Sequence, residues 1–162
     1  MITARNEPKN PRVVFEADHE RINALVDRLV AAMRADDRTL SLRLWSGTEK
    51  GILAHLDVEE MFVFPLLAEE NAVEVDALRH QHDEIRRTLG KLGIAFELRA
   101  LPIDGVVAFL ASLRAHEERE ESLLYPEAER RMPVNVARSI ANHLWRSGAC
   151  SDRPSGGPVL AT

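Results

Sequence analysis

Two segments of the chain repeat one pattern of residues that could bind a metal ion. Segments 55–65 and 116–126 each read His, three residues, Glu-Glu, and then four residues that end in an aromatic residue before Pro. Residues four apart lie on the same face of a helix, with a rise of about 6 Å between them. Each segment can therefore direct one imidazole and one carboxylate at a single point. Two such segments facing each other would supply most of the ligands of a metal site.

Two more histidines complete this pattern. His19 and His82 fall on apolar helical stripes, 36 residues before His55 and 34 residues before His116. Each begins the same local pattern, His-x-x-Ile followed by apolar residues at helical spacing. The chain is therefore internally repeated, and the repeat orders its polar residues more strongly than its apolar ones. The candidate metal ligands are His19, His55, Glu59, His82, His116 and Glu120.

Two glutamates on core-facing stripes need a positive counter-charge. Buried ionised carboxylates are costly unless they are paired or bound to a metal, and no Lys or Arg lies on the stripes. Four imidazoles and two carboxylates suit two iron ions (Fe2+ or Fe3+), with manganese or zinc as less favoured alternatives. If both glutamates bridge, each metal receives two His nitrogens and two carboxylate oxygens. A bridging oxo or hydroxo group would be a fifth ligand and would leave one position for a small molecule.

Several histidines and acidic residues near the pattern have simpler interpretations. His80 and Glu84 also read H-x-x-x-E, but they lie off the stripe that carries His82 and should face away from the core. His143 should be a surface or packing residue. Each ligand histidine should pass its second ring N–H to an acceptor. The acidic residues available for this, some of which also fit solvated helix faces, are Asp18, Glu60, Asp83 and Glu121.

Three other residue types invite a functional interpretation. Tyr125 and Phe64 should pack near the prolines that follow them, with a redox role for Tyr125 as a weaker alternative. Cys150 lies beside the tail and is better explained as incidental than as catalytic. A single cysteine also excludes an internal disulfide framework.

Long stretches of helical periodicity must position the candidate ligands, and no stretch shows sustained strand alternation. Asn10 before a proline predicts the start of the first helix, and the pair Asp36-Asp37 predicts a break and a new helix start. Asn71 followed by Glu74 resembles a capping box for the third helix. The predicted helices cover 11–34, 38–64 with one more turn towards 70, 71–100, 104–126 and 134–146.

Prolines and glycines define the remaining boundaries. Asp104 is expected to cap the fourth helix. Pro65 and Pro126 should bend or end the second and fourth helices just beyond the repeated motifs. Gly90 and Gly93 weaken the third helix locally, and close helix packing is one interpretation of them.

Four main helices with one apolar stripe each and short connections predict an all-α fold. The expected architecture is an up-down-up-down four-helix bundle with a short C-terminal fifth helix and a disordered tail. The expected organisation is a flexible N-terminus over 1–10, the bundle over 11–132, the short helix over 133–146, and a tail rich in Ser, Gly and Pro over 147–162.

Composition excludes several other classes of protein. The 162 residues are 45% hydrophobic and 29% charged, with a formal net charge of −5, and no block of Lys or Arg predicts binding to nucleic acid or an anionic membrane. No apolar run is long enough for a membrane span, and the N-terminus has no signal-peptide pattern. We therefore expect a cytoplasmic protein.

The ordered set H … H-x-x-x-E … H … H-x-x-x-E, with an aromatic residue and Pro after each second motif, resembles the hemerythrin family. The resemblance is to its HHE cation-binding branch and covers roughly residues 15–126. It implies a four-helix bundle that holds a non-haem di-iron centre. It also implies that the six candidate ligands occupy the ligand positions of the family.

Two departures from the oxygen-carrying hemerythrins bear on function. Those proteins have a fifth histidine one turn before the third-helix ligand, where this chain has Leu78. They also end the fourth-helix motif with Asp at a longer spacing, where this chain has Glu120. One metal is therefore less crowded by protein ligands, which favours reaction with peroxide or nitric oxide, or oxygen and redox sensing, over reversible oxygen carriage.

The leading hypothesis is a di-iron protein that binds or reacts with O2, NO or H2O2. Oxidoreductase activity towards peroxide or nitric oxide is one form of this hypothesis. An iron-handling or oxygen- and redox-sensing module without turnover is the alternative, and a sensor would need a protein partner for its output. A third hypothesis is a metal-free structural or partner-binding bundle.

Overall fold

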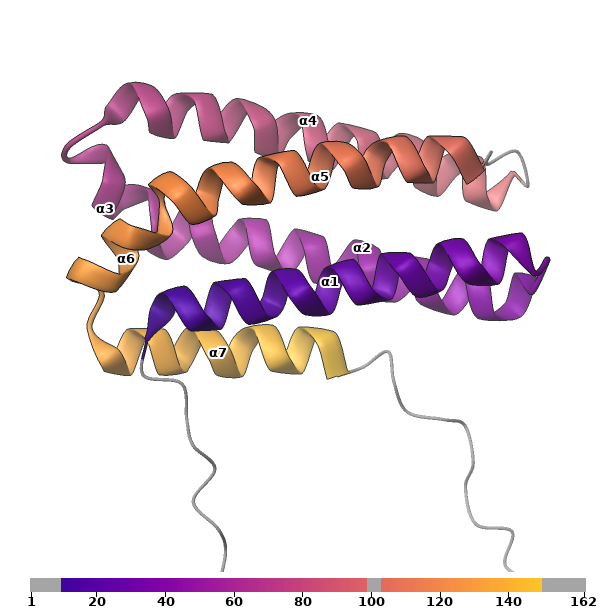
Figure 1. The fold of residues 1–162 in the computed structure, drawn as a ribbon, viewed down its shortest axis with the longest axis horizontal. Coiled ribbons are helices and arrows are strands. Elements are labelled where there is room, and N and C mark those ends of the chain that lie inside the picture. Colours follow the sequence, from indigo (N-terminus) through magenta and orange to yellow (C-terminus); the bar gives the residue numbers. More distant parts are fainter. Residues whose placement is uncertain (1–9, 99–102, 150–162) are drawn as a thin grey trace, which may run out of the picture.

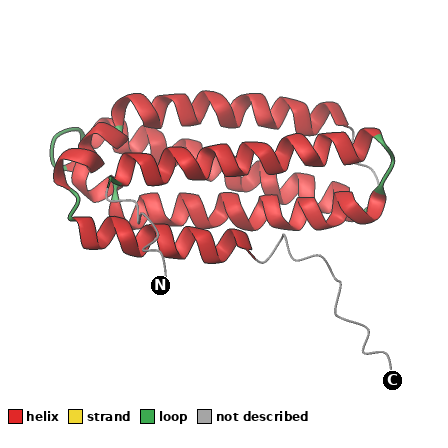
Figure 2. Ribbon diagram, turned by 60° about the horizontal axis from the view of Figure 1, so that its bottom comes forward, coloured by secondary structure: helices red, strands yellow, loops and turns green. Residues whose placement is uncertain are grey.

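Residues 10–98 and 103–149 are described by the computed structural model of the protein. This part of the chain forms helices and no strands (Figures 1 and 2). The helices are α1 (Pro11–Arg34), α2 (Arg38–Phe62), α3 (Phe64–Ala68), α4 (Ala72–Glu97), α5 (Ile103–Leu123), α6 (Tyr125–Arg131) and α7 (Val134–Ala149).

The four long helices run alternately in opposite directions. Figure 1 shows α1, α2, α4 and α5 side by side, with consecutive long helices antiparallel, and α7 lying along the outer face of α1 and α2. The predicted all-α bundle with a short C-terminal helix is confirmed. No helix of residues 10–98 and 103–149 is long and apolar enough to cross a membrane.

Three helix starts follow the capping residues that the sequence predicts. The side chain of Asn10 accepts a hydrogen bond from the Arg12 N–H at the start of α1. Asp37 caps α2 and Asn71 caps α4 in the same way, by accepting from the N–H three residues ahead. Such caps satisfy N–H groups that have no partner within the helix. Asp36 has φ 55°, a left-handed conformation that lets α1 turn tightly into α2.

Both prolines after the repeated motifs break their helices as predicted. The second helix ends at Phe62, and α3 begins two residues later with Pro65 in its first turn. The fourth long helix ends at Leu123, and α6 follows with Pro126 in its first turn. Proline lacks the N–H that would continue the preceding helix, but it fits the first turn of a new one.

Several helix boundaries differ by a few residues from the prediction: α2 ends at Phe62, α4 at Glu97 and α5 at Leu123, instead of at 64, 100 and 126. Helix α5, the fourth of the predicted helices, begins at Ile103, so Asp104 lies inside its first turn instead of capping it. There the carboxylate still interacts favourably with the helix dipole. The last helix continues to Ala149, three residues beyond its predicted end. The rest of the predicted tail, Cys150 and the N-terminus before Asn10 lie outside the described residues.

The glycines of α4 do not mark close helix packing. A Cβ atom added at Gly90 would have no neighbour within 4 Å. One added at Gly93 would meet Trp45 and Glu49 at 3.6–3.7 Å, an ordinary van der Waals distance. The interpretation of Gly90 as a close-packing residue is therefore wrong, because that position faces open space.

Two apolar clusters fill the bundle, with a layer of polar residues between them. The turn-end cluster, near the α1–α2 turn, includes Ile22, Ile52, Ile85 and Leu113. The proline-end cluster, near the two helix breaks, gathers side chains from α1, α2, α3, α4, α6 and α7 and from the breaks themselves; its members include Phe15, Val58, Phe64, Leu67, Leu78, Leu124, Tyr125 and Ile140. On each long helix the candidate ligands lie between residues of these two clusters. We call the set His19, His55, Glu59, His82, His116 and Glu120 the polar layer.

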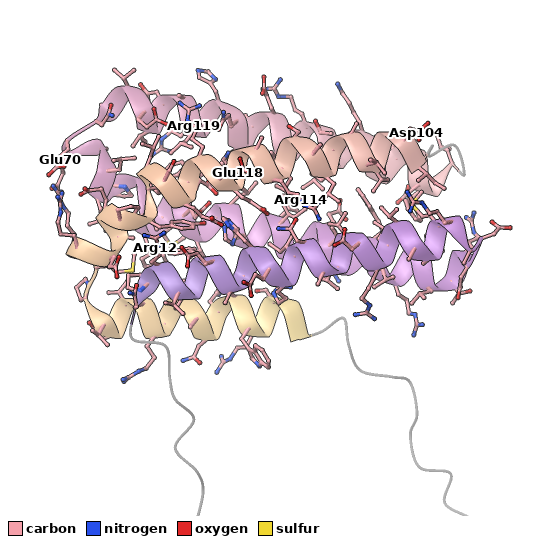
Figure 3. The ribbon with its side chains drawn as sticks, viewed as in Figure 1. Arg12, Glu70, Asp104, Arg114, Glu118 and Arg119 are labelled. Carbon is pink, nitrogen blue, oxygen red and sulfur yellow. The ribbon has the colours of Figure 1, made fainter. Side chains whose placement is uncertain are left out.

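Charged side chains of both signs cover the outside of the bundle (Figure 3). Several form ion pairs between helices, such as Arg119 with Glu74 and Arg114 with Asp27. The Glu74 carboxylate therefore holds α5 against α4, although the sequence suggested a role in capping α4. Exposed pairs of this kind contribute little individually, so the bundle depends mainly on its apolar clusters.

Candidate metal centre

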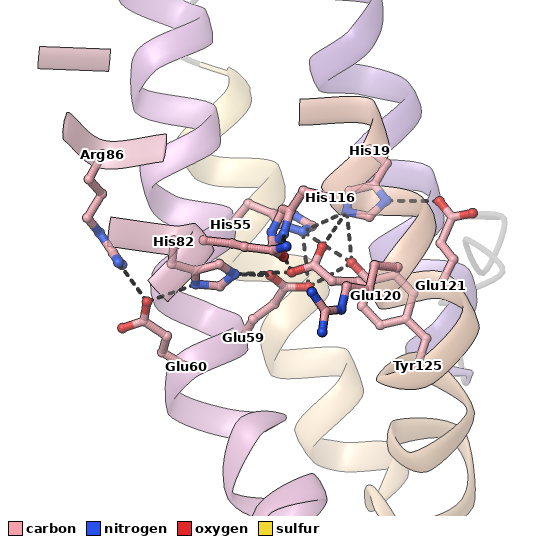
Figure 4. A network of polar contacts seen from close by, with 12 residues as sticks. His19, His55, Glu59, Glu60, His82, Arg86, His116, Glu120, Glu121 and Tyr125 are labelled. Carbon is pink, nitrogen blue, oxygen red and sulfur yellow. Dashed lines mark hydrogen bonds and ion pairs between the residues drawn. The ribbon is translucent and has the colours of Figure 1, made fainter. Parts of the chain in front are cut away.

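Each of the four long helices contributes to the polar layer. The first and third long helices, α1 and α4, each supply one histidine, and α2 and α5 each supply a histidine with a glutamate four residues later (Figure 4). None of the six side chains is more than 5% exposed. Within the motifs, His55 Nε2 lies 3.3 Å from Glu59 Oε1, and His116 Nε2 lies 2.8 Å from Glu120 Oε1. The predicted one-turn pairs therefore converge on one buried place.

The donor atoms form two groups that share both glutamates. One group comprises His19, His55, Glu59 and Glu120, and the other comprises His82, His116, Glu59 and Glu120. Within each group the donor atoms lie within 4.8 Å of one another. The structure thus brings all six predicted residues together, in two sets that could each hold a metal ion.

Each glutamate directs one oxygen towards each histidine pair. Glu59 places Oε1 3.3 Å from His55 Nε2 and Oε2 3.6 Å from His82 Nε2. Glu120 places Oε2 3.5 Å from His19 Nε2 and Oε1 3.1 Å from His82 Nε2. A carboxylate that bridges two metals needs this division of its oxygens.

Three donor atoms of the polar layer have no hydrogen-bond partner, although they are buried. They are Glu59 Oε2, Glu120 Oε2 and His116 Nε2. The short distance from His116 Nε2 to Glu120 Oε1 does not have the geometry of a hydrogen bond. A buried polar atom without a partner costs about 1–3 kcal/mol, and more when it is charged. A bound cation would satisfy all three atoms, so the donor set fits a metal.

The electrostatics of the layer favour positive charge. Burial lowers the pKa of His55, but the charge of Glu59 and the hydrogen bond to Asp18 outweigh burial and raise that pKa well above 6.5. Burial lowers the pKa values of His19 and His82, but the nearby carboxylates of Glu120 and Glu59 outweigh burial and raise both values. Burial raises the pKa of Glu120, but the close approach of His116, His19 and His82 lowers it well below 4.5. The metal-free site therefore attracts protons, and a metal ion would compete for the same place.

Each histidine is oriented by a second side chain at its other ring nitrogen. His19 Nδ1 lies 3.0 Å from Glu121, His55 Nδ1 2.9 Å from Asp18, and His82 Nδ1 2.8 Å from Glu60. His116 Nδ1 lies 2.9 Å from the amide oxygen of Gln81. When Nδ1 donates its proton to such an acceptor, Nε2 is left free to bind a metal.

Asp18, Glu60 and Glu121, which the sequence suggested as acceptors, each contact the Nδ1 atom of a histidine. Asp83, the fourth suggested acceptor, does not. Arginines hold two of them in turn: Arg21 Nε lies 2.8 Å from Asp18, and Arg86 Nη1 lies 2.6 Å from Glu60. Gln81 was missed by the sequence analysis, because the H-x-x-x-E pattern says nothing about residues that precede the third-helix histidine.

Tyr125 belongs to the polar layer as well as to the proline-end cluster. Its side chain is fully buried, and its hydroxyl donates to Glu59 Oε1 over 2.7 Å. The Tyr125 hydroxyl oxygen also lies 2.8 Å from His19 Nε2 and 3.3 Å from His55 Nε2. Burial and the charge of Glu59 raise the pKa of Tyr125 well above 10. The predicted packing role is too limited, because the hydroxyl reaches the candidate centre.

The residues that the sequence analysis set aside lie away from the layer. His80, Glu84 and His143 are all exposed. Leu78, which takes the place of the fifth histidine of oxygen carriers, is fully buried beside the layer. No donor atom therefore comes from that position.

Two hollows adjoin the polar layer. A cavity of about 10 Å³, room for about one water molecule, touches His19, His55, His116 and Glu120. Its other walls are Glu117 and four residues of the turn-end cluster: Ile22, Ile52, Leu56 and Leu113. Burial raises the pKa of Glu117, which accepts a hydrogen bond from Asn23. A groove of about 580 Å³ between α4 and α5 opens to the outside, and His116 is one of its lining residues.

Comparison with protein families agrees with this geometry. The family model of the hemerythrin HHE cation-binding domain matches residues 10–128, which span α1 to α5, the first part of α6 and the whole polar layer. Comparisons with curated proteins and with solved structures gave no significant match. Because the family match covers most of the chain, the protein belongs to the hemerythrin HHE cation-binding domain family.

Proposed function

We propose that the polar layer holds two iron ions and that the protein binds or reacts with a small diatomic molecule or peroxide there. The observation that carries this proposal is the position of Glu59 and Glu120 between two histidine pairs, with one oxygen of each directed at each pair. The metal ligands would be His19, His55, Glu59, His82, His116 and Glu120.

The bound iron ions would supply redox chemistry and an open coordination position. The protein's own residues would fix the centre and limit what reaches it. Asp18, Glu60, Glu121 and Gln81 hold the imidazole rings so that each Nε2 faces inward. Four apolar residues form part of the wall of the small cavity, and its volume of about 10 Å³, room for about one water molecule, admits only a molecule of a few atoms.

The buried leucine on α4 favours reaction over reversible oxygen carriage. With Leu78 in place of a histidine, the site near His82 and His116 has two histidine ligands instead of three. A metal with fewer protein ligands keeps room for an added ligand. Peroxide, nitric oxide and oxygen are all small enough for this position.

Metal analysis combined with optical spectroscopy tests the proposal. Protein loaded with iron under anaerobic conditions and then oxidised should contain two iron ions per chain. It should show near-ultraviolet charge-transfer bands from an oxo bridge, and azide or peroxide should alter these bands. The variant His116→Ala should lose metal.

His80→Ala is the matched control, because His80 also precedes a glutamate by four residues but is exposed. It should bind as much iron as the original protein. Iron content below one ion per chain, or unchanged iron content in His116→Ala, would contradict the proposed centre.

Storage or sensing of iron and oxygen without turnover is the second candidate function. The enclosure of the site favours it, because all six ligands are at most 5% exposed and the adjoining cavity is very small. The two candidates differ in one measurement. A reactive centre should consume peroxide faster than the same amount of free iron, whereas a storage or sensing module should not.

A further inference from the structure

We propose that Tyr125 makes the two metal positions unequal: its oxygen completes the position formed by His19 and His55, so that the small molecule binds at the position formed by His82 and His116. This inference rests on the proposed di-iron function. It concerns a residue for which the sequence predicted packing beside a proline, with a redox role as the weaker alternative.

The Tyr125 oxygen lies where a metal ligand would lie. Adjacent ligands of a six-coordinate ion with bonds of about 2.1 Å are about 3.0 Å apart. The Tyr125 oxygen is 2.8 Å from His19 Nε2, 3.3 Å from His55 Nε2 and 2.7 Å from Glu59 Oε1. His19 Nε2 and His55 Nε2 are themselves 3.0 Å apart. These four atoms therefore have the spacing of ligands around one ion.

The other metal position has no such oxygen. The repeat places Phe64 before Pro65 where the second half has Tyr125 before Pro126. The Phe64 ring lies 4.9 Å from the His82 ring, much as the Tyr125 ring lies 5.4 Å from the His19 ring. Phenylalanine has no donor atom, and the nearby Leu78 has none either. The tyrosine oxygen therefore has no counterpart in the first half of the internal repeat.

The number of ligands at each metal position shows which position stays open. The first position would have two histidines, both glutamates, Tyr125 and the bridging oxygen, which is a full set of about six. The second position would have two histidines, both glutamates and the bridge, which leaves one place open.

Access to the molecule's surface also favours the second position. The groove between α4 and α5 is lined in part by His116, a member of the second position. The small enclosed cavity touches His116 as well as both histidines of the first position, but only the groove opens to the outside. The first position is closed on one side by the Tyr125 ring, which stacks on Phe15 with ring centroids 5.0 Å apart. Both are fully buried.

Optical spectroscopy of the ferric protein tests the role of Tyr125. A tyrosine bound to iron binds as the phenolate and releases its proton to solvent. Ferric phenolate complexes absorb visible light. Because the chain has a single tyrosine, any such band must come from Tyr125. We expect the band in the iron-loaded protein and its loss in Tyr125→Phe, with two iron ions per chain in both.

Azide titration identifies the open position. The protein should bind one azide per centre, and Tyr125→Phe should still bind azide. Phe64→Tyr would place a second tyrosine oxygen beside His82 and should abolish azide binding, with iron content unchanged. The doubly exchanged variant Tyr125→Phe, Phe64→Tyr should regain azide binding, because the open position moves to the His19–His55 side.

Iron content distinguishes a failure of the proposed function from a failure of the role assigned to Tyr125. If the original protein binds no iron, the proposed function fails. If it binds two iron ions but shows no visible band that depends on Tyr125, the ligand role of Tyr125 is wrong. If Tyr125→Phe loses azide binding while Phe64→Tyr keeps it, the small molecule binds beside Tyr125 and the assignment of positions is wrong.

Discussion

Each of the four buried histidines has its Nδ1 atom held by a second side chain, but only three of these partners are carboxylates. Asp18, Glu60 and Glu121 carry negative charge, whereas Gln81 beside His116 is neutral. A carboxylate partner makes an imidazole a stronger electron donor than an amide does. The metal near His116 should therefore be the more electron-poor of the two, which also suits it to accept an added ligand.

Removing one carboxylate partner should weaken metal binding without unfolding the bundle. For Asp18→Asn we expect metal affinity to fall by about 10–100-fold, the usual effect of losing a group that orients a ligand. Competition with a chelator of known affinity measures this change. Asp27→Asn is the control on the same helix, since Asp27 pairs only with exposed Arg114 among its described contacts. Equal losses in both variants would show that Asp18 has no special role.

The raised pKa values of the histidines predict opposite effects of pH on metal-free and metal-loaded protein. The pKa of His55 is raised because Glu59 and Asp18 outweigh burial, so protonation stabilises the metal-free fold below about pH 6.5. That contribution is lost as pH rises through the raised pKa. Metal binding needs unprotonated imidazole and strengthens over the same range.

Scanning calorimetry at pH 6 and pH 8 checks this expectation. The increase in Tm on metal loading should be larger at about pH 8 than at about pH 6. The carboxylate of Glu120, with its lowered pKa, stays ionised throughout this range and contributes no opposing trend. An increase that is equal at the two pH values, or larger at pH 6, would contradict the charge state assigned to the histidines.

At the scale of elements, the sequence predicted the helices, and the histidines and glutamates that the structure brings together, better than the contacts between helices. The period of the apolar stripes predicted that His82, and not His80, faces the core. In the structure His82 is buried and His80 is exposed. The prolines located both helix breaks. Gln81 and the reach of the Tyr125 hydroxyl could not be predicted, because they depend on the rotation and separation of helices that come from distant parts of the chain.

Two glycines should respond differently to alanine. Gly90→Ala should stabilise the protein by about 0.5–1 kcal/mol, because alanine is the better helix former and the position faces open space. A Cβ atom at Gly51 would lie 3.2 Å from the guanidinium of Arg21, which also holds Asp18. Gly51→Ala should therefore stabilise less than Gly90→Ala, or destabilise. Urea unfolding of the two variants measures the difference.

The groove between α4 and α5 should be the route by which small molecules reach the centre. Ala115 lines this groove next to His116, so Ala115→Trp should slow the binding of azide in stopped-flow measurements without changing iron content. Ala17→Trp is the matched control, since Ala17 is also exposed and lines a hollow between α1 and α7 on another face. Slowing by Ala17→Trp alone would place the route on that other face.

For the molecule as a whole, metal should contribute directly to folding stability. The three unpaired donor atoms of the polar layer come together only in the folded chain, so a metal that binds them favours folding. A metal present at 100 times its dissociation constant would add about 2.7 kcal/mol. Treatment with a chelator should lower Tm, and restoring iron should reverse the change. An unchanged Tm would support a metal-free structural bundle instead.

The polar layer divides the bundle into two apolar clusters of different kinds. The turn-end cluster is built from α1, α2, α4 and α5 alone, whereas the proline-end cluster also gathers the short helices α3 and α6 and the added helix α7. Without metal, the layer between them keeps three buried polar atoms that have no hydrogen-bond partner. The two ends should then open independently, and the amide protons of α3 and α6 should exchange with deuterated solvent well before those of the turn end.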